Sequence, residues 1–135
     1  MKFVQLTEEQ VEDIEERLEE FDQKHMPPAI EGRVQLGIEE DGRLVAGLDA
    51  CITTFRILYV STVFVEEDCR RKGYGRLLMN AMEARARELG VNTIRLDTFD
   101  FQGKDFYEAM GYTLAGSYEN AEDGYSEYFF VKRLG

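Results

Sequence analysis

The chain has 135 residues, of which 44% are hydrophobic and 32% are charged, and its formal net charge is −11. This length predicts one domain, residues 1–135, with enough apolar side chains to form a core without metal or disulfide support. The negative charge argues against general nucleic-acid binding, which needs a basic surface, and no stretch approaches the ~20 apolar residues of a membrane span.

The few metal-binding residue types are spread through the sequence. Cys51, Cys69 and His25 show no spacing typical of a metal site, so we expect no metal. Two thiols among many Lys and Glu residues favour a reducing compartment, and the N-terminus runs directly into a charged segment without the pattern of a signal peptide. We therefore expect a cytoplasmic protein.

Residues 1–6 predict a short strand followed by a helix. Thr7 and Gln10 form a plausible capping box at the helix start, and His25-Met26-Pro27-Pro28 ends the helix because proline cannot continue it. Apolar residues at helical spacing predict a stripe that is buried against the core. They are Val11, Ile14, Leu18 and Phe21.

The same helix is strongly acidic. Residues 7–24 contain nine Asp and Glu side chains, opposed only by Arg17 and Lys24, which leaves the segment with a charge of −7. One interpretation is a solvated helix face that aids solubility. The other is an acidic rim that attracts a cationic substrate.

Downstream of this helix, alternating apolar residues and turn residues predict six further strands. Their expected ranges are 33–39, 44–53, 58–65, 93–98, 112–117 and 126–132. A long helix is expected over 75–89, ended by Gly90, and a short helix over 105–110, ended by Gly111. With the strand at 1–6, this order predicts an α/β fold with a mixed sheet of about seven strands and helices on its faces.

The sequence Arg70-Arg71-Lys72-Gly73-Tyr74-Gly75-Arg76 places four cations where an apolar strand gives way to a helix. Cations are disfavoured at a helix N-terminus, whose free N–H groups are already positive, so this concentration indicates a bound anion. Gly73 and Gly75 allow positive φ angles and a close approach of the backbone to a ligand. The segment therefore predicts a phosphate or pyrophosphate site.

A second motif, Phe106-Tyr107-Glu108-Ala109-Met110-Gly111-Tyr112, follows one strand later. Together the two motifs resemble the GNAT superfamily of acyl-CoA-dependent N-acyltransferases. Its signature is an apolar strand, then Gln/Arg-x-x-Gly-x-Gly/Ala opening a helix, then Phe-Tyr-x-x-x-Gly-Phe/Tyr. The resemblance covers nearly the whole chain and implies the family's mixed, mostly antiparallel, twisted sheet with helices on both faces.

The resemblance implies acetyl-CoA as the cosubstrate. Backbone N–H groups of Arg71 to Arg76 would cradle the pyrophosphate, Arg70 would open the loop, and the edge of the preceding strand would pair with the pantetheine arm. Asp100 stands where relatives carry Asn, and Gln102 could supply the missing amide. The implied contacts to acetyl-CoA are Val63, Phe64, Val65, Arg70, Arg71, Lys72, Gly73, Tyr74, Gly75, Arg76, Gln102 and Tyr107.

The implied activity is transfer of an acetyl group to a primary amine of a small molecule or protein, by direct attack in a ternary complex. Tyr107 occupies the position of the general acid that protonates the departing thiolate. Tyr59 occupies the position where some relatives carry a glutamate base, so a water-relayed proton path is the preferred alternative. Four further residues are candidates for orienting that water or binding a cationic amine: Asp49, Ser61, Asp97 and Glu127.

Several other interpretations stay open. Tyr107 and Tyr59 could serve packing alone, and Cys69 is expected to be an ordinary buried thiol. A catalytically inactive acyl-CoA sensor or interaction module would keep the same loop, and a dinucleotide-binding fold is weakened because Leu78 stands in the third-glycine position. The aromatic strand Tyr128–Val131 could either pair across the axis of a homodimer or complete the sheet of the monomer.

Overall fold

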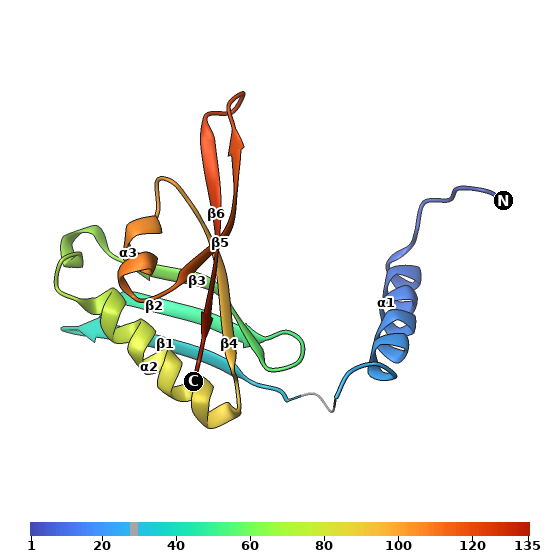
Figure 1. Ribbon diagram of the computed structural model, residues 1–135, viewed down its shortest axis with the longest axis horizontal. Coiled ribbons are helices and arrows are strands. Elements are labelled where there is room, and N and C mark those ends of the chain that lie inside the picture. Colours follow the sequence, from blue (N-terminus) through green and yellow to red (C-terminus); the bar gives the residue numbers. More distant parts are fainter. Residues whose placement is uncertain (28–29) are drawn as a thin grey trace.

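The computed structural model describes residues 1–27 and 30–135. Its elements, in chain order, are α1 (Glu8–Gln23), β1 (Arg33–Glu40), β2 (Arg43–Ile52), β3 (Ile57–Val65), the 3-10 turn η1 (Glu67–Cys69), α2 (Tyr74–Leu89), β4 (Thr93–Phe99), α3 (Lys104–Ala109), β5 (Thr113–Asn120) and β6 (Tyr125–Arg133) (Figure 1). Among these residues, no helix has the length and apolar character needed to cross a membrane.

The six strands form one sheet in the order β1-β2-β3-β4-β6-β5. All neighbours are antiparallel except β3 and β4, which are parallel and are connected through α2. This confirms the mixed, mostly antiparallel sheet, but the count is six, because the strand expected at residues 1–6 does not form. Phe3 is 91% exposed there, so this segment has no sheet partner that would order it as a strand.

The aromatic strand near the C-terminus is part of β6, which lies between β4 and β5. Both of its edges are therefore occupied by strands of the same chain. Of the two interpretations of Tyr128–Val131, completion of the monomer's own sheet is confirmed and pairing of this strand across a dimer axis is wrong.

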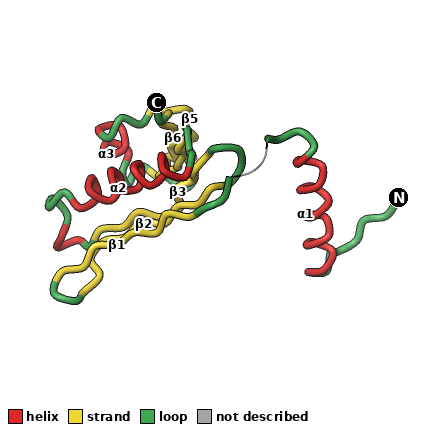
Figure 2. The backbone as a smooth tube through the Cα atoms, turned by 90° about the horizontal axis from the view of Figure 1, so that it is seen from below, coloured by secondary structure: helices red, strands yellow, loops and turns green. Residues whose placement is uncertain are grey.

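Helix α2 provides the core of the domain because its buried residues fall on one side. Leu78, Met79, Met82 and Ala86 are at most 3% exposed and pack on the sheet. Gly90 ends the helix with φ +91°, a value glycine adopts without strain. Both α2 and α3 lie on the same face of the sheet, since Phe106 and Tyr107 of α3 pack against the same core (Figure 2).

One charged side chain is buried in this core. Glu83 on α2 is 5% exposed, accepts a hydrogen bond from the Tyr112 hydroxyl at 3.1 Å, and forms an ion pair with Lys132 Nζ at 2.9 Å. Lys132 Nζ also donates to the carbonyl of Met110 at 2.9 Å. The cluster joins α2, the end of α3 and β6, so a buried charge is compensated by fixed partners.

Helix α1 lies apart from the rest of the chain (Figures 1 and 2). Its start is as predicted, because Thr7 and Gln10 form both hydrogen bonds of the capping box, and it ends at Gln23 before the proline pair, of which Pro28 lies outside the described residues. The expectation that its apolar stripe is buried is wrong within one chain. Ile14 is 47%, Leu18 60% and Phe21 59% exposed.

Candidate functional site

The basic loop makes a sharp turn before α2. Arg71 and Gly73 have φ angles of +78° and +81°, and Gly73 is the N-cap of α2. Among the described residues, the backbone N–H groups of Gly73, Tyr74, Gly75 and Arg76 donate to no other group, as expected for the first turn of a helix. These unpaired donors, with the positive end of the helix dipole, can bind an anion.

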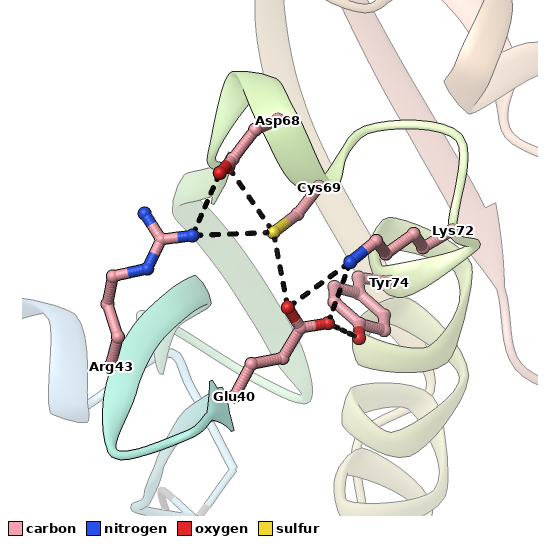
Figure 3. A network of polar contacts seen from close by, with 6 residues as sticks. All are labelled: Glu40, Arg43, Asp68, Cys69, Lys72 and Tyr74. Carbon is pink, nitrogen blue, oxygen red and sulfur yellow. Dashed lines mark hydrogen bonds and ion pairs between the residues drawn. The ribbon is translucent and has the colours of Figure 1, made fainter.

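A carboxylate from a different strand holds this loop in place (Figure 3). Glu40, at the end of β1, accepts hydrogen bonds from Lys72 Nζ at 3.1 and 3.2 Å and from the Tyr74 hydroxyl. The Tyr74 hydroxyl and then Lys72 hold the pKa of Glu40 below its ordinary value. The side chains of Lys72 and Tyr74 are thus engaged with Glu40. The backbone N–H of Tyr74 stays free for a ligand, whereas that of Lys72 donates to the carbonyl of Cys69 at 3.4 Å.

Glu40 could not be identified from the sequence. A glutamate at the end of an alternating strand looks like an ordinary surface residue, and the loop that it contacts begins 30 residues later. Arg43 and Asp68 form a neighbouring ion pair at 3.0 Å, and Cys69 lies between the two pairs (Figure 3). Burial and then Asp68 raise the pKa of the Cys69 thiol, which supports its interpretation as a structural thiol.

Arg70 connects the loop to the preceding strand. Its Nε donates to the carbonyl of Val65, the last residue of β3, at 3.0 Å. The guanidinium therefore fixes the point at which the chain leaves the strand for the turn. Arg76 is exposed at the start of α2.

Strands β3 and β4 separate after a short contact. They pair only at Ile57–Tyr59 and Thr93–Arg95, although β3 continues to Val65 and β4 to Phe99. Beyond that point β4 remains paired with β6, and β3 with β2. The edge of β3 that includes Val63, Phe64 and Val65 thus has no strand partner on the β4 side within the described residues, so an extended ligand can bind there as an additional strand.

Tyr107 lies on α3 beside this gap. Its ring packs against Tyr112 and Phe130, at centroid distances of 6.1 and 6.0 Å, and burial raises the pKa of its phenol. Within residues 1–27 and 30–135, its hydroxyl makes no hydrogen bond. The phenol is therefore protonated at neutral pH and free to donate.

Two glycines leave room for the aromatic side chains of α3. A Cβ on Gly103 would lie 3.2 Å from the Tyr107 ring, and one on Gly75 would lie 3.2 Å from the Phe106 ring. Each is tighter than ordinary van der Waals contact. The two glycines thus let α3 approach both its own preceding loop and the start of α2.

The side chain of Gln102 is hydrogen-bonded to the end of β4. Its Oε1 accepts hydrogen bonds from the backbone N–H of Phe99 at 2.9 Å and from the Thr98 hydroxyl at 3.3 Å, so the side chain caps the end of β4. Asp100 is exposed next to it. Both line a hollow of about 350 Å³, together with Lys104 and Tyr128. Lys104 is a cation of this hollow that the motifs do not identify.

Tyr59 reaches across the base of the gap. Its hydroxyl donates to Asp97 on β4 at 3.1 Å, and the Arg95 guanidinium lies 4.6 Å from its ring centre. Burial and then the hydrogen bond to Asp97 raise the pKa of Tyr59. The phenol therefore retains its proton, and the carboxylate of Asp97 accepts the hydrogen bond between the two.

The polar residues proposed to bind an amine lie on the sheet face opposite α2, which we call the outer face. Tyr59 and Asp97 alternate with the buried residues Leu58 and Leu96, and are therefore on this face. Asp49 and Glu127 are also partly exposed, and Asp49 accepts a hydrogen bond from Gln35 at 3.1 Å. The outer face thus carries several carboxylates near the separation of β3 and β4.

Comparison with known proteins agrees with this geometry. The family model described as "Acetyltransferase (GNAT) family" matches residues 3–112. A blasticidin-S acetyltransferase of Streptomyces morookaense is 35% identical over 96 residues, which is 70% of each chain.

Solved structures show the same fold. A crystal structure of an acetyltransferase from Bacillus cereus superposes on 99% of this chain and 98% of its own, with a TM-score of 0.91 and 28% identity. A crystal structure of an aminoglycoside 6'-N-acetyltransferase complexed with coenzyme A covers 85% of this chain and 78% of its own, with a TM-score of 0.66 and 20% identity.

Proposed function

The chain belongs to the GNAT acetyltransferase family, and on that premise we propose that it moves an acetyl group from acetyl-CoA to a primary amine of a small cationic molecule. The observation that carries the proposal is the separation of β3 and β4, which leads directly to the turn with free N–H groups at the start of α2. An extended arm that ends in a diphosphate matches both features at once.

The residues of the gap and the loop suit acetyl-CoA. The diphosphate would accept hydrogen bonds from the backbone N–H groups of Gly73 to Arg76, with Arg71 and Arg76 adding positive charge. The amide groups of the pantetheine arm would pair with the free edge of β3 at Val63–Val65. A backbone N–H of this edge would also polarise the thioester carbonyl.

In the proposed reaction, the neutral amine attacks the thioester carbonyl carbon, and the C–S bond breaks to leave an amide and a thiolate. Tyr107 gives its phenolic proton to the thiolate. Its hydroxyl is free, and burial, which raises the pKa of the phenol, keeps the proton in place until the thiolate forms. The proton lost by the amine must be accepted on the outer face. No covalent intermediate on the protein is needed.

Tyr59 is assigned a positioning role in place of direct proton abstraction. It retains its proton and donates a hydrogen bond to Asp97, so it fixes the direction of that carboxylate. We assign to Asp97, acting through a water molecule, the acceptance of the proton from the amine. Its negative charge would also bind the ammonium form of the incoming substrate.

The substrate class follows from the charge of the outer face. Asp49, Asp97 and Glu127 favour a cationic acceptor, and the named relatives act on blasticidin-S and on aminoglycosides. These are small molecules, so we place a small amine before a protein amine as the acceptor. Cys51 and Cys69 are both free thiols, which supports a reducing location such as the cytoplasm.

The test has two parts. Calorimetry measures the binding of CoA, and a thiol reagent measures release of free CoA when acetyl-CoA is mixed with a polyamine, an aminoglycoside, blasticidin-S or a lysine peptide. We expect binding of CoA and turnover with at least one small amine. Tight binding without turnover on any amine would instead support the alternative of an acyl-CoA sensor, and no binding of CoA would contradict both.

A further inference from the structure

Helix α1 carries an apolar surface that is exposed among the residues that the structure describes. Ile14, Leu18 and Phe21 lie on one side at helical spacing and are 47–60% exposed. The opposite side is almost entirely acidic. An amphipathic helix of this kind is stable when its apolar side is packed against a partner.

The outer face of the sheet contains a surface that matches such a helix. A groove of about 590 Å³ runs over β1, β2 and β3, and its lining is mainly apolar. Gly37 and Gly47 are neighbours in the sheet register and line the groove. A helix can approach the backbone closely at Gly47, whereas the side chain of Leu44 lies over Gly37. Leu44 and Phe64 stand at its sides and are 63% and 50% exposed.

The two surfaces do not meet within one chain. The residues directly before β1 are anchored on the body, because Ile30 packs against the core and the carbonyl of Gly32 accepts a hydrogen bond from the N–H of Ile52 at 3.0 Å. Helix α1 extends away from that anchor (Figure 2). The Bacillus cereus crystal structure superposes on 99% of this chain with a TM-score of 0.91, so the superposition extends over α1 as well as the sheet.

We propose that α1 of one copy packs its apolar stripe into the outer-face groove of a second copy, and that the second copy does the same in return. Reciprocal exchange of this kind gives a closed dimer with twofold symmetry. Its interface joins two surfaces that are each unpartnered in a single chain.

The size of the interface suits a stable dimer. A helix of 16 residues is about 24 Å long and about 10 Å wide, and it would contact the groove along most of that length. Two such contacts together approach the roughly 1,600 Å² of a standard protein interface. The edge of β1 is open in the single chain. In the dimer, residues 1–6 of the partner would come within reach of this edge.

Sedimentation of the full chain tests the proposal first. We expect a mass of twice the 15.6 kDa chain, with dissociation on dilution. A mass of one chain at all concentrations overturns the proposal, because α1 would then fold back on its own groove or remain uncovered.

Two variants then test which surfaces form the dimer. Leu18→Glu places a charge in the stripe, and Gly47→Glu fills the groove, where a Cβ meets only the carbonyl oxygen of Leu36 at 3.7 Å. Each variant alone should be monomeric. Mixing them in equal amounts should restore a dimer, because one intact helix then meets one intact groove. A variant that stays dimeric, or a mixture that stays monomeric, overturns the proposal.

Matched controls show whether loss of the dimer results from unfolding or from the added negative charge alone. Gln23→Glu adds the same charge on the polar side of α1, and Tyr118→Glu adds it on an exposed position of β5 outside the groove. Both should remain dimeric. The circular dichroism spectrum at room temperature should be unchanged in all four variants, since each altered position lies at the surface of a single chain or in open space.

Discussion

Lys72 Nζ lies 3.1 and 3.2 Å from the two carboxylate oxygens of Glu40, and this contact joins the end of β1 to the turn before α2. The Tyr74 hydroxyl donates to the same carboxylate. Glu40, which is remote in sequence, thus holds through Lys72 and Tyr74 a turn in which Arg71 and Gly73 both have positive φ. The turn is ordered before a ligand arrives, which lowers the entropic cost of binding.

Replacing Glu40 with Gln should therefore weaken CoA binding several-fold, because the turn loses its anchor. This loss should outweigh the gain from Lys72, which is freed from its ion pair with Glu40. Calorimetry with CoA measures this effect. Tighter binding in Glu40→Gln would show instead that Glu40 competes with the diphosphate for Lys72.

The same contact has a defined pH dependence. Because the pKa of Glu40 is lowered in the folded chain, its stabilising contribution is fully present above the ordinary pKa of 4.5 and is lost as the pH falls below that value. The melting temperatures of the wild type and Glu40→Gln should thus differ by a constant amount from pH 6 to 8 and converge as the pH falls below 4.5 and through the lowered pKa of Glu40. A difference that disappears already near pH 6 would contradict this assignment.

Gly73→Ala should weaken CoA binding at least tenfold. A Cβ at this position meets no atom of the chain within 4 Å, so the effect arises from the φ angle of +81° and from crowding of the diphosphate. Gly124 is a matched control, because its φ is +74° and its Cβ would also meet nothing. Both substitutions should lower stability by about 1 kcal/mol, but Gly124→Ala should bind CoA as the wild type does.

Tyr107→Phe should reduce kcat by about 100-fold, the usual contribution of a general acid, with little change in CoA affinity. Steady-state kinetics and calorimetry measure the two quantities separately. Tyr118→Phe, at an exposed tyrosine of β5, which β6 separates from β4, is the control. An unchanged kcat in Tyr107→Phe would remove its assigned role.

The alkaline side of the pH–rate profile should not report Tyr107. Since burial raises its pKa above the ordinary value of 10.0, the phenol remains protonated to at least that pH. We expect kcat to hold or rise between pH ~7 and ~9.5 as the amine loses its proton. A fall of kcat within this range, absent in Tyr107→Phe, would contradict the raised pKa.

Glu83→Leu should lower the free energy of unfolding by about 3 kcal/mol, because Lys132 is then left partly buried without its counter-ion. The double variant Glu83→Leu, Lys132→Met should recover a large part of the loss. Urea unfolding measures both. The single variant Lys132→Met completes the comparison. If the double variant loses the sum of the two single-variant losses, the pair is not coupled.

Local sequence determined most of the elements. The capping box at Thr7 and the C-cap at Gly90 each act within a few residues, and both are where the sequence predicts them. The cation-rich turn and the Phe-Tyr motif also identified the family, whose model matches residues 3–112. The resemblance assigned the pantetheine to the edge of β3, and the structure adds that β3 and β4 separate there.

Tertiary structure decided what lies beside these elements. The sequence indicated a strand at residues 1–6 and a buried stripe on α1, yet neither has a partner in its own chain, since propensity and periodicity do not specify which surface an apolar face will contact. Likewise, Glu40 beside Lys72, and Asp97 beside Tyr59, arise from strand order and register, which depend on the packing of the whole sheet. Contacts between neighbours in sequence follow from the chain itself, whereas contacts across the sheet exist only once the core has set the distance between strands.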